Sequence, residues 1–149
     1  MANAANIQNF VKFGRKIVCI GRNYKDHIAE MKAALPTKPV VFIKPATSYI
    51  QQGHSIVIPP ECDDLHHEVE LGVVIGSLAR NVEQSSAMSF VAGYCLALDM
   101  TARDLQQDCK TKGLPWEIAK GFDTSCPIGE FIPAEKISDP HDLDLWSVY

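Results

Sequence analysis

The 149-residue sequence lacks several features that would assign it to a specialised class of protein. No apolar run approaches the roughly 20 residues that a membrane-spanning helix needs, so we expect no membrane partner. Positive charge is not in excess, because 14 Lys and Arg residues stand against 18 Asp and Glu residues, for a net charge of −4. Without a basic stripe, a nucleic-acid partner is not expected either.

Paired cysteines are also missing. The five cysteines are odd in number and include no Cys-x-x-Cys pair, which indicates free thiols in a reducing compartment and small core residues. With 46% hydrophobic and 21% charged residues, the composition is that of an ordinary globular domain with a sizeable core.

What the sequence does contain is a series of short apolar segments separated by Gly and Pro. The pattern predicts a mixed α+β fold that is predominantly β. Helices are expected over 24–34, and from a capping Thr101 through Cys109, with a loop-rich tail after them. The predicted strands cover residues 16–20, 40–43, 55–58, 68–76, 91–100 and, as a short alternating segment, 143–146.

Three carboxylates on these segments indicate a metal site. Glu68 and Glu70 share one face of a strand, and Asp99 ends the next long apolar run, where an unpaired carboxylate is costly. Oxygen ligands without cysteine or paired histidine at ligand spacing favour Mg²⁺, with Mn²⁺ as the alternative, over zinc. The competing interpretation is a solvated strand face, on which Glu-x-Glu is common.

Cationic side chains accompany this acidic cluster and suit an anionic substrate. Arg103 and Gln106 are spaced i,i+3 on the helix that follows Asp99, so a guanidinium and an amide lie near the carboxylates. Taken singly, each cation is better explained as a surface charge. The other cations of this set are Arg22, Lys44 and Lys120.

His27 and Glu30 form a candidate catalytic pair. Their i,i+3 spacing on a predicted helix allows the carboxylate to orient the imidazole as a general base. The alternative is an ion pair on the helix surface, which contributes little to stability.

Several ordered motifs together resemble the fumarylacetoacetate hydrolase superfamily, and especially its small acylpyruvase-type members. The motifs are Gly21-Arg22-Asn23-Tyr24 with His27 and Glu30, Lys44-Pro45, His67-Glu68-x-Glu70-Leu71, Asp99-x-Thr101-Ala102-Arg103-Asp104, and Lys112-Gly113-Leu114-Pro115-Trp116 with Lys120. The resemblance implies a mixed β-sandwich roll and a homodimer.

The resemblance also implies roles for individual residues. The metal, Mg²⁺ or Mn²⁺, is expected on Glu68, Glu70 and Asp99, which is the set that the strand pattern indicates. Catalytic positions are expected at His27, Glu30 and Lys120, and substrate-binding positions at Arg22, Tyr24, Lys44, Arg103 and Gln106.

The expected substrates are acylpyruvates and oxaloacetate. A bound metal and Lys120 would stabilise negative charge on the 2-keto oxygen. For an acylpyruvate, His27 would activate water, and C–C cleavage would release pyruvate and a carboxylate. The same charge distribution serves decarboxylation of oxaloacetate and its tautomerisation, and the sequence does not rank the three reactions.

The resemblance divides the chain into an extension, residues 1–15, and the N-terminal two-thirds of a fumarylacetoacetate hydrolase-like catalytic domain, residues 16–149. We expect a roll that is incomplete at the C-terminus, because the family's later Thr-Gly-Thr-Pro-type loop is missing. Two alternatives therefore stand beside the enzyme: a weakly active or noncatalytic isoform that pairs with a full-length protein, and an isomerase of unsaturated keto dicarboxylic acids. The expected compartment is the mitochondrion, with the cytosol as the alternative.

Overall fold

A long antiparallel strand pair forms the centre of the fold. The computed structural model describes residues 7–24 and 36–146, and its largest sheet contains β5 (Val69–Ile75) and β6 (Val91–Leu98) side by side. The order across this five-stranded sheet is β3-β8-β6-β5, and β9 also pairs with β6. The remaining members are β3 (Tyr49–Gln51), β8 (Cys126–Ile128) and β9 (Ile132–Pro133).

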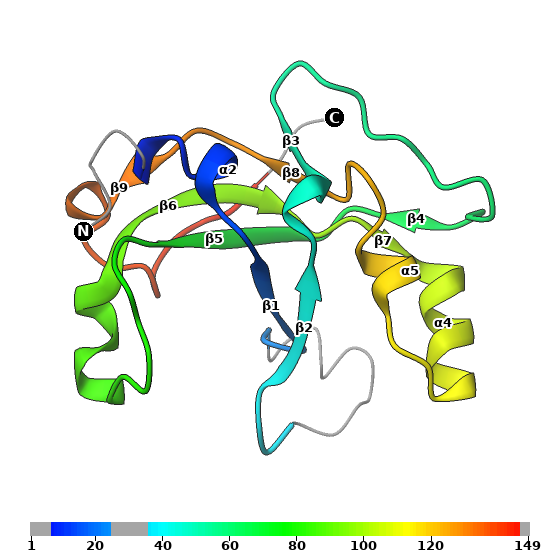
Figure 1. Ribbon diagram of the computed structural model, residues 1–149, viewed down its shortest axis with the longest axis horizontal. Helices are drawn as coiled ribbons and strands as arrows, with labels where there is room; N and C mark the ends of the chain where they lie inside the picture. The colour runs from blue at the N-terminus through cyan, green and yellow to red at the C-terminus, as the bar shows by residue number, and fades with distance from the viewer. Residues whose placement is uncertain (1–6, 25–35, 147–149) are drawn as a thin grey trace.

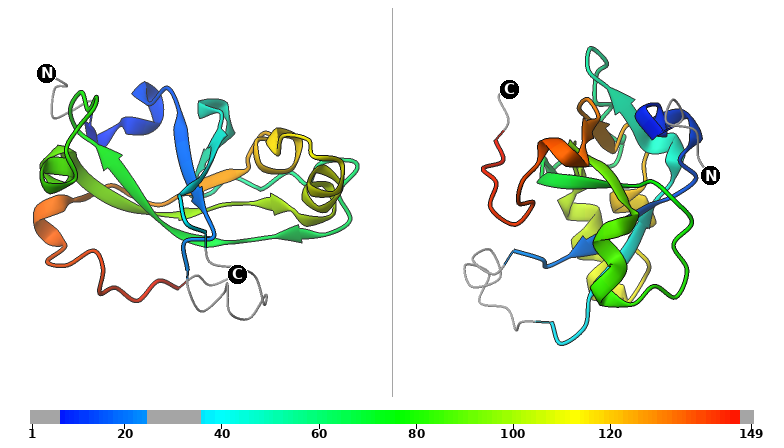
Figure 2. Two further views of the ribbon diagram at one scale, coloured as in Figure 1. Left: turned by 90° about the horizontal axis from the view of Figure 1, so that it is seen from below. Right: turned by 90° about the vertical axis from the view of Figure 1, so that its left-hand side faces the viewer.

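Two smaller strand pairs complete the β structure. The ribbon of β1 (Ile17–Gly21) and β2 (Val40–Lys44) crosses the β5–β6 pair steeply (Figure 1), and β4 (Leu65–His66) pairs with β7 (Thr101–Ala102). Figure 1 and the left view of Figure 2 show α4 and α5 together at one end of the long pair. The helical elements are α2 (Phe10–Phe13), α4 (Arg103–Lys112), α5 (Glu117–Lys120), η1 (Ala46–Ser48), η2 (Gln84–Phe90) and η3 (Ala134–Lys136).

The core lies where α2 and the start of β1 pack against the large sheet. Cys95, Cys126 and Ile128 are its most buried members, and the partly buried side chains of Phe10, Val11, Ile17, Tyr49 and Ala97 pack against them. A side chain at Gly72 would lie 2.5 Å from Cys95 Sγ, so glycine lets the cross-strand thiol fill this layer. All five cysteines are free, which confirms the sequence prediction.

The prediction of a mixed, predominantly β fold is confirmed, and most of the long strands lie at the apolar segments of the sequence. Two predicted strands are wrong: residues 55–58 and 143–146 have no strand, because neither segment has a backbone partner in the described part of the chain. Within residues 7–24 and 36–146, no helix is long and apolar enough to cross a membrane.

The helix after Asp99 begins later than predicted. Thr101 belongs to β7 and does not cap α4; its hydroxyl donates to the carbonyl of Asp99 at 3.1 Å. The helix continues to Lys112 and ends at Gly113, which takes a left-handed conformation with φ 65°. The predicted helix over 24–34 lies almost wholly outside the described residues.

Candidate functional site

The carboxylates of the site meet at one end of the β5–β6 pair. The backbone N–H of Asp99 donates to the carbonyl of Glu68 at 2.8 Å, directly beyond the paired residues Val69 and Leu98. Glu68 directly precedes β5 in extended backbone and Glu70 lies two residues further on within it, so the two side chains leave the same face. The backbone therefore places all three predicted ligands on one side of the strand pair.

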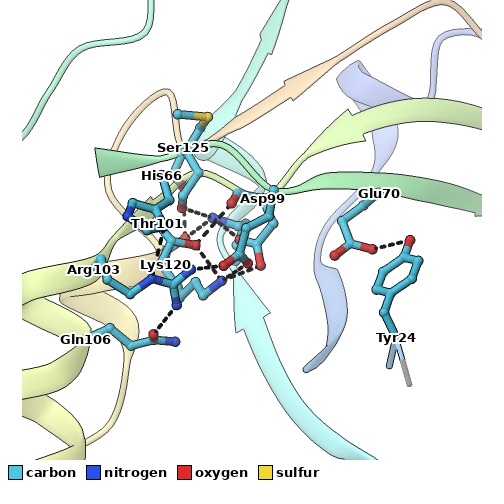
Figure 3. Close-up of polar contacts among 12 residues, drawn as sticks. Tyr24, His66, Glu70, Asp99, Thr101, Arg103, Gln106, Lys120 and Ser125 are labelled. Atoms are coloured by element: carbon cyan, nitrogen blue, oxygen red, sulfur yellow. Dashed lines mark hydrogen bonds and ion pairs between the residues drawn. The ribbon is translucent and has the colours of Figure 1, made fainter. Parts of the chain in front are cut away.

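Lys120 joins two of these carboxylates. It is the last residue of α5 and is only 3% exposed. Its Nζ donates to Asp99 Oδ2 at 2.6 Å, to Glu68 Oε2 at 2.8 Å and to Thr101 Oγ1 at 2.6 Å, as Figure 3 shows in part. These three bonds use all three protons of the ammonium group.

A second buried lysine holds the other side of Asp99. Lys44, the last residue of β2, is 1% exposed, and its Nζ lies 2.9 Å from Asp99 Oδ1. The same ammonium donates to the carbonyls of Met100, at 3.1 Å, and Lys120. Burial lowers the pKa of Lys44, and the charge of Asp99 opposes that shift. Lys44 therefore contacts a predicted metal ligand and has almost no surface to offer a substrate.

Helix α4 supplies the guanidinium and the amide that the sequence predicts. Arg103 pairs with Glu68 Oε1 and donates from Nη1 to Gln106 Oε1 at 2.7 Å. Burial raises the pKa of Glu68, but the charges and hydrogen bonds of Lys120 and Arg103 outweigh this and hold it below its ordinary value. Glu68 is thus kept ionised.

Glu70 has a different partner. Its Oε2 accepts a hydrogen bond from the Tyr24 hydroxyl at 3.1 Å, and Figure 3 shows this pair apart from the Lys120 cluster. Burial raises the pKa of Glu70 to about 7; the Tyr24 bond opposes the shift, and the negative charges of Asp99 and Glu68 add to it. Arg22, two residues before Tyr24, has an exposed side chain. Its backbone takes a left-handed conformation with φ 56°, which non-glycine residues rarely adopt.

The residues present fit a hard divalent cation by donor type and by placement on one face. Asp99 Oδ1 is buried, and among the described residues its partner is the Lys44 ammonium at 2.9 Å, so a further lone pair of this oxygen remains available to a cation. As the side chains stand, no three His, Cys, Asp or Glu residues within 7–24 and 36–146 converge on one point. Glu68 and Asp99 share Lys120, whereas Glu70 faces Tyr24.

The structure thus brings Lys44, Arg103, Gln106 and Lys120 together around Glu68 and Asp99. His27 and Glu30 lie outside the described residues. The sequence analysis missed Thr101 as a partner of Lys120, and it missed Lys110, which donates to Gln106 Oε1 at 3.1 Å. The i,i+4 spacing of Gln106 and Lys110 was the signal available for the second of these.

Comparisons with known proteins identify the family of the chain. The family model described as fumarylacetoacetate (FAA) hydrolase C-terminal matches residues 16–149. The chain is 52% identical over 146 residues to the mitochondrial oxaloacetate tautomerase FAHD1 of Bos taurus, covering 98% of this chain and 66% of that protein. It is 51% identical over 141 residues to the mitochondrial oxaloacetate decarboxylase of Dictyostelium discoideum, covering 94% of this chain and 65% of that protein.

Solved structures show the same similarity. A fumarylpyruvate hydrolase from Pseudomonas aeruginosa, in complex with Mn²⁺ and pyruvate, matches with a TM-score of 0.76 and 37% identity over 85% of this chain and 56% of its own. Yeast ynq8, a fumarylacetoacetate hydrolase family protein, matches with a TM-score of 0.69 and 36% identity over 88% of this chain and 59% of its own. The chain spans just under two thirds of the length of the Bos taurus and Dictyostelium discoideum relatives.

Proposed function

Because the chain belongs to the fumarylacetoacetate hydrolase family, we propose that it is a divalent-metal-dependent enzyme acting on small 2-keto acids. The proposed reactions are tautomerisation or decarboxylation of oxaloacetate and hydrolysis of acylpyruvates to pyruvate and a carboxylate. Relatives named oxaloacetate tautomerase and oxaloacetate decarboxylase support the substrate class. The observation that carries the proposal is Lys120, which lies buried between Glu68 and Asp99.

Glu68, Glu70 and Asp99 are the residues that would hold the metal ion, with Mg²⁺ proposed and Mn²⁺ as the alternative. Carboxylate oxygens suit both ions, and the related fumarylpyruvate hydrolase contains Mn²⁺. The ion would supply stabilisation for negative charge that develops on the 2-keto oxygen of the substrate.

Cationic side chains of the protein would stabilise the same negative charge on the 2-keto oxygen. The Lys120 ammonium would exchange its hydrogen bond to Glu68 for one to the developing negative charge, while its bonds to Asp99 and Thr101 keep it in position. Arg103, held by Gln106, would orient the substrate carboxylate through its guanidinium. Lys44 is proposed to support this set from behind Asp99.

The remaining roles rest on the sequence motif. His27, oriented by Glu30, is proposed as the general base that activates water for acylpyruvate cleavage. Arg22 and Tyr24 are proposed to complete the substrate site, and the Tyr24 bond to Glu70 supports a position near the metal ligands.

The proposal is tested by assaying residues 1–149 with oxaloacetate and acetylpyruvate, with Mg²⁺ and after chelation. Chelation is expected to abolish turnover, and Lys120→Met is expected to lower kcat at least a hundredfold, the usual effect of removing one preorganised charge donor. Lys112→Met is the matched control, because within residues 7–24 and 36–146 Lys112 pairs with Asp108 of the same helix and with no residue of the site. A cooperatively folded chain with no turnover of either substrate would contradict the proposal and favour the noncatalytic alternative.

Assembly and location complete the proposal. We expect a homodimer, since the β1–β2 ribbon exposes the side chains of Val18, Ile20, Val41 and Ile43. The mitochondrion is the proposed compartment, because the relatives at about 52% identity are named as mitochondrial proteins. Import of a tagged chain into isolated mitochondria, read as protection from added protease, would test this, and a chain that remains outside and is digested would contradict it.

A further inference from the structure

A buried serine contacts the backbone of Lys120 and has no role in the proposed reaction. Lys120 is the last residue of α5, and a helix of four residues is too short to hold its own end in place. The position of Lys120 therefore depends on bonds to the rest of the fold. Its carbonyl oxygen accepts a hydrogen bond from Ser125 Oγ at 2.9 Å and another from Lys44 Nζ.

Ser125 joins the two segments that carry Asp99 and Lys120. It directly precedes β8 and is completely buried. Its carbonyl accepts the backbone N–H of Met100, the residue after Asp99, at 3.0 Å, while its hydroxyl donates to the Lys120 carbonyl. One residue thus sets the spacing between the segment after β6 and the end of α5.

The turn that leads from Lys120 to Ser125 is itself held in place. Thr124 has a left-handed φ of 68°, which is rare for a β-branched residue and persists only where the surrounding structure enforces it. Thr124 Oγ1 accepts the backbone N–H of Val57 at 2.8 Å, and the N–H of Ser125 donates to the carbonyl of Phe122 at 3.1 Å. The Ser125 hydroxyl therefore extends from a fixed backbone position.

The contacts of the Lys120 ammonium are sensitive to where its backbone lies. Nζ is 2.6 to 2.8 Å from oxygens of Glu68, Asp99 and Thr101, so a shift of the helix end would lengthen all three bonds together. A group that stabilises charge in a reaction must be held to within about half an ångström of its productive position. A bond to the Lys120 carbonyl is one way to meet that requirement.

We infer that Ser125 is a positioning residue for Lys120, because its hydroxyl holds the backbone from which the ammonium extends. The inference rests on the proposed function and adds to it a residue that does not touch the substrate. Lys44 donates to the same carbonyl, so loss of the Ser125 hydroxyl shifts Lys120 without releasing it. The effect on the rate is therefore smaller than that of removing the Lys120 ammonium.

The test measures kcat and KM of residues 1–149 with Mg²⁺, for oxaloacetate and acetylpyruvate. Ser125→Ala is expected to lower kcat about tenfold, the factor that corresponds to one hydrogen bond between neutral groups. KM is expected to change less than twofold, because Lys120 acts on charge that develops in the transition state. Ser125→Cys, which keeps a weak donor of similar size, is expected to give an intermediate kcat.

Ser48→Ala is the matched control. Ser48 is also completely buried, and its hydroxyl also donates to a backbone carbonyl, that of Pro45, at 2.7 Å. The two alanine variants thus lose the same kind of bond at the same depth, and Ser48→Ala is expected to keep kcat within twofold. All variants are first shown to unfold cooperatively in urea, and Ser125→Cys takes the place of Ser125→Ala if the latter does not fold.

A double-substitution cycle separates positioning from a general loss of folded protein. If Ser125 acts through Lys120, Ser125→Ala has no further effect on kcat in the Lys120→Met background, whereas a folding defect lowers kcat equally in both backgrounds. An unchanged kcat for Ser125→Ala, or the same tenfold loss in both backgrounds, would overturn the inference and leave the proposed function intact. If the unsubstituted chain turns over neither keto acid, the proposed function fails, and the inference fails with it.

Discussion

At the scale of single residues, the central feature is Asp99 between two buried ammonium groups. Lys120 Nζ lies 2.6 Å from one of its oxygens and Lys44 Nζ lies 2.9 Å from the other. Buried charges are tolerated because they are paired, and loss of one partner leaves the other uncompensated. The lysine at position 44 therefore matters to the folded state whatever the chain binds.

Lys44→Met is expected to destabilise the chain by roughly 3–5 kcal/mol, the usual cost of breaking a buried ion pair from one side. The substitution removes the ion-pair partner of Asp99 Oδ1 and the donor to the Met100 carbonyl. Urea unfolding monitored by circular dichroism measures this change. Lys38→Met is the control, because Lys38 is exposed just before the same strand. A loss below about 1 kcal/mol, which is the range for exposed ion pairs, would show that the Lys44–Asp99 pair contributes no more to stability than a surface pair does.

At the scale of elements, the start of α4 is tied to the loop that precedes β4. Asp104 Oδ2 accepts the backbone N–H of Asp63 at 2.7 Å, and the N–H of Arg103 donates to the Asp64 carbonyl at 2.7 Å. These bonds fix the first turn of the helix, and they thereby fix the backbone position from which the Arg103 side chain extends. The hydrogen bond from the Asp63 N–H, with that from Leu105, holds the pKa of Asp104 below its ordinary value of 3.8.

This bond network predicts a pH dependence of stability. Because the pKa is lower in the folded state, Asp104 contributes stability that is complete above about 3.8 and is lost as the pH falls through the lower, folded value. Unfolding free energies of the unsubstituted chain and Asp104→Asn are expected to differ at neutral pH and to converge in acid. Asp108→Asn on the same helix is the control. A difference that stays constant with pH would disprove the role of the Asp104 charge.

At the scale of the whole molecule, the β1–β2 ribbon has two unlike faces. One face carries Cys19, Phe42 and Lys44. On the other, the cross-strand pairs Val18–Ile43 and Ile20–Val41 place four β-branched side chains together, each 43–57% exposed. Because contiguous apolar side chains of this kind favour association, this face is the proposed homodimer contact.

Self-association through this face is the expected consequence. The Val41→Thr and Ile43→Thr double variant keeps β-branched residues in the strand while reducing the apolar surface. Sedimentation velocity is expected to show a dimer for the unsubstituted chain and a shift toward monomer for the double variant. Val57→Thr, a 61% exposed site outside any strand, is expected to change nothing. Equal association of both proteins would place the dimer contact elsewhere.

The sequence by itself determined the long strands and the set of polar residues around the carboxylates. The apolar runs at 16–20, 40–43, 68–76 and 91–100 each contain an observed strand, because strand formation there follows from side-chain type and alternation. The sequence did not determine the structure of residues 55–58. These residues have the same composition as the strands but no backbone partner in the described part of the chain. Pairing depends on which segments the fold brings side by side, and no local pattern records that.

The same division applies to the site. Glu68, Glu70, Asp99, Arg103 and Lys120 could be selected from the spacing of charged residues and from the family motif. The sequence could not distinguish Lys44, buried against Asp99, from an exposed substrate-binding lysine, nor could it pair Glu70 with Tyr24 rather than with Lys120. The packing of β2, β5, β6 and α5 against one another decides which side chains come into contact. Because burial then sets the strength of each charge interaction, only the tertiary structure decides what each charge does.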